Sequence, residues 1–184
     1  VSSFGSDAVA GYTIGIRIII FSLLPSWGIS NAAATLVGQN LGAEQPDRAE
    51  KSVWITGKIN AVFLGALGFI FILFPSFFIN IFIQDPAVVE SGVACLRIIS
   101  MGFVMYGFGM VMVQSFNGAG DTVTPTIINL ISFWIIEIPL AWILAKPLGM
   151  EQNGVYWSII IGETIMTFLA IWLFRKGTWK EKKV

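Results

Sequence analysis

The sequence predicts an all-α protein, a polytopic bundle of five transmembrane helices. Of its 184 residues, 55% are hydrophobic and only 12% are charged, whereas about a quarter of a soluble domain is charged. Five segments reach the roughly 20 mostly apolar residues that a helix needs to cross a bilayer. Each is longer than the ~9–11 residues of a barrel strand, and none alternates polar with apolar residues.

The predicted spans run over about 8–38, 52–74, 93–114, 125–145 and 154–174, and a tail over 175–184 follows them. The first segment contains Pro25 and is longer than a bilayer requires. It must therefore tilt, project beyond the membrane or bend at Pro25, where a backbone hydrogen bond is lost. Gly11 and Gly15 in the same segment form a GxxxG pattern, which allows close contact with another helix.

Helix starts are marked by a capping side chain followed by proline. Asp85-Pro86 and Thr124-Pro125 have this pattern, and Gln45-Pro46 has it more weakly. Asp121, earlier in the second of these turns, is expected to accept hydrogen bonds from nearby backbone N–H groups.

Lys and Arg near the helix ends predict the orientation, because cytosolic loops are enriched in them. One side of the membrane collects Arg48, Lys51, Arg175, Lys176, Lys180, Lys182 and Lys183. The other side holds Lys146, with Arg17 and Arg97 if they reach outward. The tail is therefore expected in the cytosol and Val1 outside. Because five spans is an odd number and the chain lacks an initiator Met, we expect a C-terminal fragment of a longer protein.

Four short stretches carry a family resemblance. They are LVGQNLGAEQPDRAEKS at 36–52, FNGAGDTVTP at 116–125, IPLAWILA at 138–145 and LFRKGTWK at 173–180. Together, in this order, they resemble the multidrug and toxic compound extrusion (MATE) transporters. The resemblance implies twelve helices in two six-helix lobes. The five helices would be the eighth to twelfth, and the partners missing from the chain would be the seventh helix and the N-terminal lobe.

The resemblance also implies a function and a location. Such transporters export amphipathic, mostly cationic compounds in exchange for H⁺ or Na⁺ by alternating access, and use no other cofactor. The expected location is the lipid bilayer of a bacterial plasma membrane. The chain alone, with half of the cavity absent, is expected to be inactive. The alternatives are a lipid-linked-sugar flippase of related architecture, which would need a basic cavity, and a membrane assembly subunit that transports nothing.

Glu137 and Glu163 are the candidates for coupling to the ion. Each lies near the centre of a span, where an ionised carboxylate costs at least a few kcal/mol unless it is paired, hydrated or ion-bound. One of them would bind H⁺ or Na⁺. The alternative is a structural glutamate that is neutral, hydrogen-bonded in a helix contact, or paired with a basic residue on a missing helix.

The candidates for a substrate cavity are polar or adaptable side chains on the first and third helices. They are Asn31, Gln39, Met101, Met105, Tyr106, Met112 and Gln114. The methionines recur with Phe108 along one predicted helix face, and methionine adapts to varied ligands. Ordinary packing or helix capping is the alternative for each. Some MATE transporters carry a cation-binding Asp on the tenth helix, and the equivalent position here falls at or near Tyr106. No acid occurs between 91 and 120, so that cation site is not supported, and the alternative is a coupling site in the missing lobe.

Other functions are disfavoured. A formal net charge of zero gives no basic surface for nucleic acid. The chain has no histidine and one cysteine, Cys95, which argues against a zinc site. The Gly-Ala-Gly-Asp-Thr turn lacks a lysine at phosphate-loop spacing. With no nucleophile–base pair in view, the chain is not expected to be an enzyme.

Overall fold

The computed structural model describes residues 1–181, and their regular structure is helical. The elements are η1 (Ser2–Phe4), α1 (Ser6–Gly42), α2 (Pro46–Leu73), α3 (Pro75–Asn80), α4 (Pro86–Ser100), α5 (Phe103–Gly118), α6 (Val123–Asn129), η2 (Leu130–Glu137), α7 (Ile138–Ala145), α8 (Glu151–Arg175) and η3 (Thr178–Glu181). Lys182 and Lys183, which contributed to the predicted orientation, lie outside the described residues.

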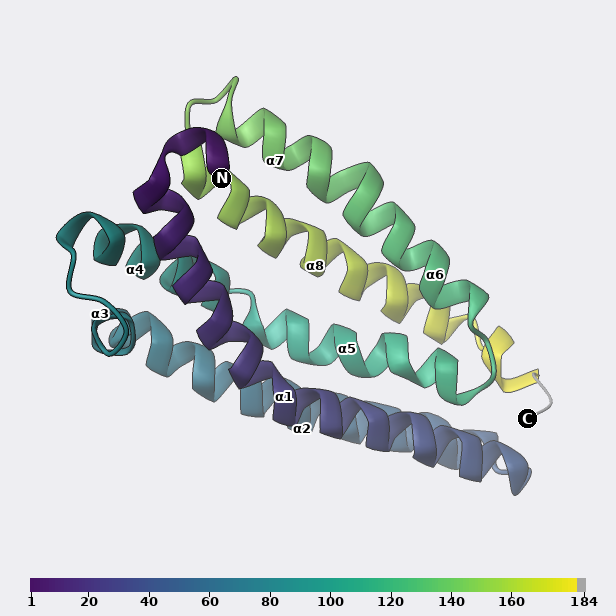
Figure 1. Ribbon diagram of the computed structural model, residues 1–184. Coiled ribbons are helices and arrows are strands. Elements are labelled where there is room, and N and C mark those ends of the chain that lie inside the picture. The colour runs from purple at the N-terminus through teal and green to yellow at the C-terminus, as the bar shows by residue number, and fades with distance from the viewer. Residues whose placement is uncertain (182–184) are drawn as a thin grey trace.

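Helix α1 is 37 residues long and contains Pro25 in its interior. At 1.5 Å per residue it would extend for about 55 Å, well beyond the hydrocarbon thickness. It stays one helix and bends about midway, as Figure 1 shows. The bend follows from proline, which has no N–H for the helical hydrogen bond and crowds the preceding turn.

The structure corrects the predicted third span. Instead of one helix over 93–114, two helices, α4 and α5, meet at an angle of 55°. Met101 and Gly102 form the break, and their N–H groups donate to carbonyls three residues back, Ile98 O and Ile99 O. Such tight turns do not continue the α-helical hydrogen-bond pattern. The start of α4 agrees with the prediction, because the Asp85 carboxylate caps it.

The fourth span is one continuous apolar stretch with an irregular centre. Helix α6 passes into η2, a π-helical segment, which leads into α7. Pro139 lies just beyond Glu137, the last residue of η2, and cannot donate a backbone hydrogen bond. The predicted cap at Thr124 is also corrected, since α6 already begins at Val123. Asp121 does bind the turn as expected, accepting from the Thr124 backbone N–H at 3.2 Å and its hydroxyl at 2.7 Å.

Helix α5 lies at the centre of the bundle, against α1, α2 and α8. Glycines allow these close approaches. A Cβ on Gly107 would lie 2.8 Å from the backbone oxygen of Asn60 on α2. The Asn60 side chain then donates to Gly107 O at 2.8 Å, which links the two helices. On the other side, Thr167 of α8 donates to Met105 O at 2.9 Å.

The predicted GxxxG surface is a close helix contact. A Cβ on Gly11 would lie 2.6 Å from the backbone N of Gly92 on α4, and one on Gly15 would lie 3.0 Å from Cys95 Sγ. Small residues at such positions let two membrane helices approach closely. Through this contact the N-terminal half of α1 packs against α4.

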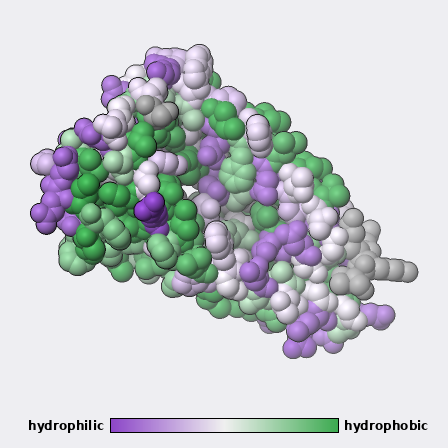
Figure 2. All heavy atoms as spheres, in the orientation of Figure 1, coloured by the Kyte–Doolittle hydropathy of each residue, from purple (hydrophilic) through white to green (hydrophobic). Residues whose placement is uncertain are grey.

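The lengths and composition of the helices fit a membrane. Four helices are long and apolar enough to cross, and the bent α4–α5 pair supplies a fifth candidate span. In Figure 2, apolar side chains cover the region over α7, and polar side chains gather where α1 turns into α2. Large apolar side chains of η2 and α7 are exposed, among them Trp134, Ile138 and Trp142. The predicted all-helical membrane bundle is therefore confirmed.

The segment after α8 folds back onto the polar end of the bundle. Trp179 is fully buried, stacks on Phe174 at a ring distance of 4.6 Å, and donates its indole N–H to Phe174 O at 2.9 Å. Lys180 pairs with Glu50 at 2.5 Å and with Asp47 at 3.2 Å. The hydrogen bond to Glu50 is the main reason that the pKa of Lys180 is raised. Through these side-chain contacts the segment links the end of α8 to the start of α2.

Candidate functional site

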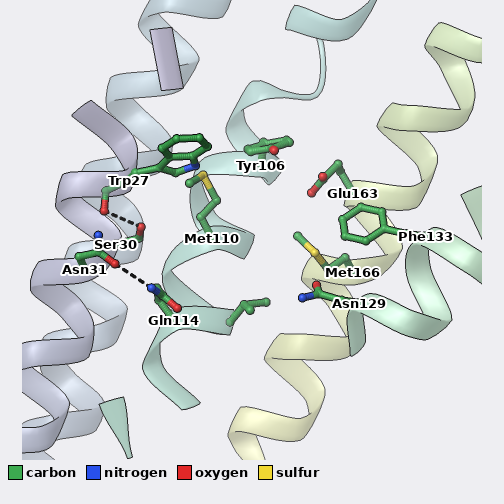
Figure 3. A pocket seen from close by; sticks show the side chains of 11 residues that line it. Trp27, Ser30, Asn31, Tyr106, Met110, Gln114, Asn129, Phe133, Glu163 and Met166 are labelled. Carbon is green, nitrogen blue, oxygen red and sulfur yellow. Dashed lines mark hydrogen bonds between the residues drawn. The ribbon is translucent and has the colours of Figure 1, made fainter. Parts of the chain in front are cut away.

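A pocket of about 400 Å³ opens between α1, α5 and α8, with α6 and η2 closing one side. Figure 3 shows the side chains that surround it. They are Trp27, Ser30, Asn31, Tyr106, Met110, Val113, Gln114, Asn129, Phe133, Glu163 and Met166. Aromatic rings, two thioethers and neutral amides make up most of the lining. Glu163 is the acidic residue, and neither lysine nor arginine is among these lining residues.

Irregular helix segments carry the aromatic part of the lining. Trp27 follows the bend at Pro25, Tyr106 comes one turn after the break between α4 and α5, and Phe133 belongs to the π-helical segment. On α5, Met110, Val113 and Gln114 continue the face of Tyr106 at helical spacing. The pocket is thus built from one face of α5 and from the bent parts of its neighbours.

Glu163 is a deeply buried acidic residue in the wall of the pocket. Only 5% of the residue is exposed, and its Oε2 has no hydrogen-bond partner among the described residues. Its carboxyl group and the Tyr106 ring point toward one another across the space between α8 and α5 (Figure 3). A buried carboxyl oxygen without a partner costs free energy. A ligand that brings positive charge or a hydrogen-bond donor would offset this cost.

A chain of amides lies at the other end of the pocket. Gln114 Nε2 donates to Asn31 Oδ1 at 2.7 Å and links α5 to α1. Asn117 Nδ2 donates in turn to Gln114 Oε1. These groups are exposed, so the same donors and acceptors are available to a polar part of a bound molecule.

Glu137 lies behind Glu163 and does not line the pocket. Its side chain packs directly on Gly162 of α8, where an added Cβ would lie 2.8 Å from Glu137 Oε2 and 3.0 Å from Glu137 Cβ. The Oε2 atom is buried and has no hydrogen-bond partner in residues 1–181. Because Gly162 precedes Glu163, the two glutamates belong to one contact between η2 and α8, within electrostatic range of each other.

The structure brings some of the sequence candidates together and separates others. Asn31, Tyr106, Gln114 and Glu163 share the pocket. Gln39 lies farther along α1, at its polar end, and is exposed. Glu137 lies behind the pocket, as described above.

The predicted methionine face is corrected. Met101 belongs to the break between α4 and α5 and is 49% exposed, so it does not continue the face of α5. Met105 and Met112 lie on a side of α5 roughly opposite to the pocket, with Met112 fully buried in the core. Phe108, on the same side, packs on Trp54 at 5.8 Å.

Several lining residues were not among the candidates, chiefly Trp27, Met110, Asn129, Phe133 and Met166. A sequence signal did exist for one helix. Tyr106, Met110, Val113 and Gln114 follow the helical repeat and mix polar with apolar side chains. The methionine face on the opposite side of the helix was equally regular, and the sequence does not tell which of the two faces lines the pocket.

Comparison with known proteins identifies the architecture. A family model described as MatE matches residues 1–143. The chain belongs to the MatE family. This confirms the resemblance found in the four short stretches, and it places the chain in a family of membrane transporters, which are not enzymes.

Relatives and solved structures agree with MatE membership. A Thermotoga maritima protein named as a probable multidrug resistance protein NorM is 30% identical over 98% of this chain. The Bacillus subtilis protein named as a probable multidrug resistance protein YoeA is 21% identical over the whole chain. In structure, this MatE chain superimposes on the MATE transporter ClbM in complex with Rb⁺ with a TM-score of 0.88, at 24% identity and over 97% of its length.

An outward-facing MATE family transporter of the MOP superfamily has the same TM-score, 0.88, at 16% identity and over 97% of this chain. At such identities the likeness concerns the fold alone. The MatE chain spans 39% of the Thermotoga relative and 42% of the ClbM chain. It therefore matches part of the transporter fold.

Proposed function

We propose that this chain forms the eighth to twelfth helices, in the C-terminal lobe, of a secondary antiporter that exports amphipathic, mostly cationic compounds in exchange for H⁺ or Na⁺. The observation that carries the proposal is the pocket itself. It combines the rings of Trp27 and Phe133 with the thioethers of Met110 and Met166, around the buried carboxyl group of Glu163. Aromatic faces attract cations, thioethers adapt to varied shapes, and a carboxylate pairs with positive charge.

The pocket also weighs against the alternatives. A flippase for lipid-linked sugars would need basic groups for an anionic headgroup, whereas the described lining offers a carboxyl group and amides. In a subunit that only assembles with others, a buried carboxyl oxygen without a partner at a pocket wall would cost free energy and serve no binding role. Export by alternating access accounts for both features, because a transporter must bind its substrate and also release it.

The proposal extends to the whole protein. The seventh helix and an N-terminal lobe would complete the cavity, so the 184 residues alone are expected to transport nothing. The membrane is proposed to be a bacterial plasma membrane. Its cytosolic side would face the end where α1 meets α2 and where Lys180 pairs with Glu50, with Val1 on the outside.

The test uses the full-length protein that contains this chain, reconstituted in vesicles and supplied with a proton or sodium gradient. Ethidium should move against its concentration gradient, and Glu163→Gln should slow its transport at least tenfold, because a charge-assisted contact is worth about 1.5–3 kcal/mol. Glu90→Gln, on the exposed side of α4, is the matched control and should transport normally. Unchanged transport by the Glu163 variant at equal protein abundance would refute the pocket assignment.

A further inference from the structure

Two acidic residues belong to the contact between η2 and α8, and one of them, Glu163, reaches the pocket. Glu163 lines the pocket, while Glu137 is held behind it on the bare backbone of Gly162. Both have a buried Oε2 atom without a hydrogen-bond partner among the described residues. A glutamate with a purely structural role would be expected to have hydrogen-bond partners within the fold for both carboxyl oxygens. Neither Glu137 nor Glu163 has them for both in the part of the chain that the structure describes.

The groups around the pair leave its negative charge uncompensated. From α5, Tyr106 faces Glu163, and from α1 the nearest pocket residues, Trp27, Ser30 and Asn31, are uncharged. Helices α6 and α7, which also pack against α8 or η2, contribute no acidic or basic side chain.

The titratable groups farther out do not compensate it either. Tyr12 of α1 lies within electrostatic range of Glu137 and stacks on Tyr156 at 6.0 Å. On α4, Cys95 is buried and Arg97 is exposed on the outside of the bundle. Lys146, which follows α7, lies over the Phe4 ring at 5.1 Å, and Lys180 of η3 is engaged with Glu50.

Two carboxylates close together in a medium of low dielectric cannot both be ionised without a large cost, and they then titrate as a pair. We infer that Glu137 controls the protonation of Glu163: the pair keeps one proton while the pocket is empty and releases it to water when an organic cation binds at Glu163. The cation replaces the charge of the proton, so the net charge of the site is the same before and after binding. Glu137 is thus a positioning residue that acts through Glu163.

The backbone around Glu137 gives the pair room to respond. The π-helical segment ends at Glu137, and π-helical turns are often found at functional sites. Pro139 removes a helical hydrogen bond close by, so this turn is less constrained than a regular one. A proton suits the site better than a hard metal cation, which takes about six or more oxygen ligands, whereas Phe133 and Met166 occupy the neighbouring wall.

The inference rests on the proposed function, and proton release upon binding tests it separately from transport. The full-length protein, in weakly buffered detergent solution with a pH-indicator dye, is titrated with tetraphenylphosphonium. We expect the wild-type protein to release up to one proton for each cation bound, with a maximum near the pH at which the pair titrates. Glu90→Gln should behave identically.

Two variants separate the roles of the pair. Glu163→Gln should abolish the release and weaken binding roughly tenfold to a hundredfold. Glu137→Gln should keep binding within about threefold but move the pH profile of release to lower pH, because the remaining carboxyl group no longer has an acidic neighbour. Gly162→Ala, which keeps both acids but displaces the Glu137 carboxyl group, should move the profile in the same direction.

The outcomes are distinct. If tetraphenylphosphonium does not bind to the wild-type protein, the proposed pocket function fails and the inference fails with it. If it binds without releasing a proton, or if the profiles of Glu137→Gln and Gly162→Ala coincide with that of the wild type, only the inference is overturned. Release that requires added Na⁺ at constant pH would also overturn it, because a metal cation would then occupy the pair.

Discussion

Replacing Trp179 by alanine should detach the segment that follows α8 from the rest of the bundle. The Trp179 side chain is fully buried against Phe174, and its indole N–H donates to the carbonyl of Phe174. A buried tryptophan covers roughly 150–250 Å², which at about 25 cal/mol per Å² corresponds to roughly 4–6 kcal/mol as an upper limit. Measured Trp→Ala changes in protein cores cost about 3–5 kcal/mol.

This cost is large compared with what holds the segment. Ordering each backbone residue costs about 1–2 kcal/mol, so the few residues of η3 dock with a net free energy of only a few kcal/mol. The ion pairs of Lys180 are on the surface and contribute about 1 kcal/mol or less each. Without Trp179 the remaining contacts do not offset the ordering cost, and the segment should open while the transmembrane helices stay folded.

Hydrogen exchange of the full-length protein in detergent measures this directly. Amides of residues 176–181 should exchange at least a hundredfold faster in Trp179→Ala, and those of α5 should not change. The control is Trp172→Ala, near the end of α8. Trp172 is 56% exposed with Lys176 over its ring at 3.5 Å, and its loss should cost about 1 kcal/mol or less. Equal protection of residues 176–181 in Trp179→Ala and wild type would refute this reasoning.

The remaining predictions concern single polar contacts. Asn60→Ala removes the link from α2 to Gly107 O and should lower stability by about 0.6–1.7 kcal/mol, measured by unfolding in mixed detergent micelles. Asp85→Ala should cost about 1 kcal/mol by removing the cap of α4, and Asp85→Ser should restore most of it. Lys180→Met should lose about 1 kcal/mol or less, and this loss should shrink in high salt. The hydrogen bond to Glu50 raises the pKa of Lys180. The stability that Lys180 contributes is therefore complete below the ordinary lysine pKa of about 10.4 and is lost only as the pH rises through the raised value. Unfolding measured between neutral and strongly alkaline pH would show this loss.

The sequence was sufficient for the helices because their signal is the length of apolar stretches, which the bilayer itself requires. It was also sufficient for contacts set by local chemistry, such as the cap at Asp85 and the glycine surface at Gly11. It was not sufficient for the break at Met101 and Gly102. A single glycine in an apolar stretch is compatible with a continuous helix. The two tight turns that end α4 lie where Gly102 packs closely on Ile160 of α8, and such a contact between distant segments is not visible in the local sequence.

The pocket was harder to predict because it depends on how the helices are rotated about their own axes. Helix α5 has two regular faces, one with Met105 and Met112 and one with Met110 and Gln114. The face with Met105 and Met112 packs against other helices. Gly107 and Gly109 set this orientation, because they allow α5 to approach α2 and α8 closely. Such tertiary constraints are not visible in the periodicity of one helix, so the choice between the two faces requires the assembled bundle.

The irregular parts of the backbone lie around the pocket, and this arrangement has a physical reason. In a bilayer, a backbone group that lacks its helical hydrogen bond is tolerated only where protein or a polar cavity surrounds it. The bend at Pro25 lies next to Trp27, the break at Gly102 lies one turn before Tyr106, and the π-helical segment contains Phe133. Three separate helices thus depart from regular geometry beside the same cavity. A bundle optimised for stability alone would use straight helices there, so the shared location of these irregularities is consistent with a pocket that changes shape in the transport cycle proposed above.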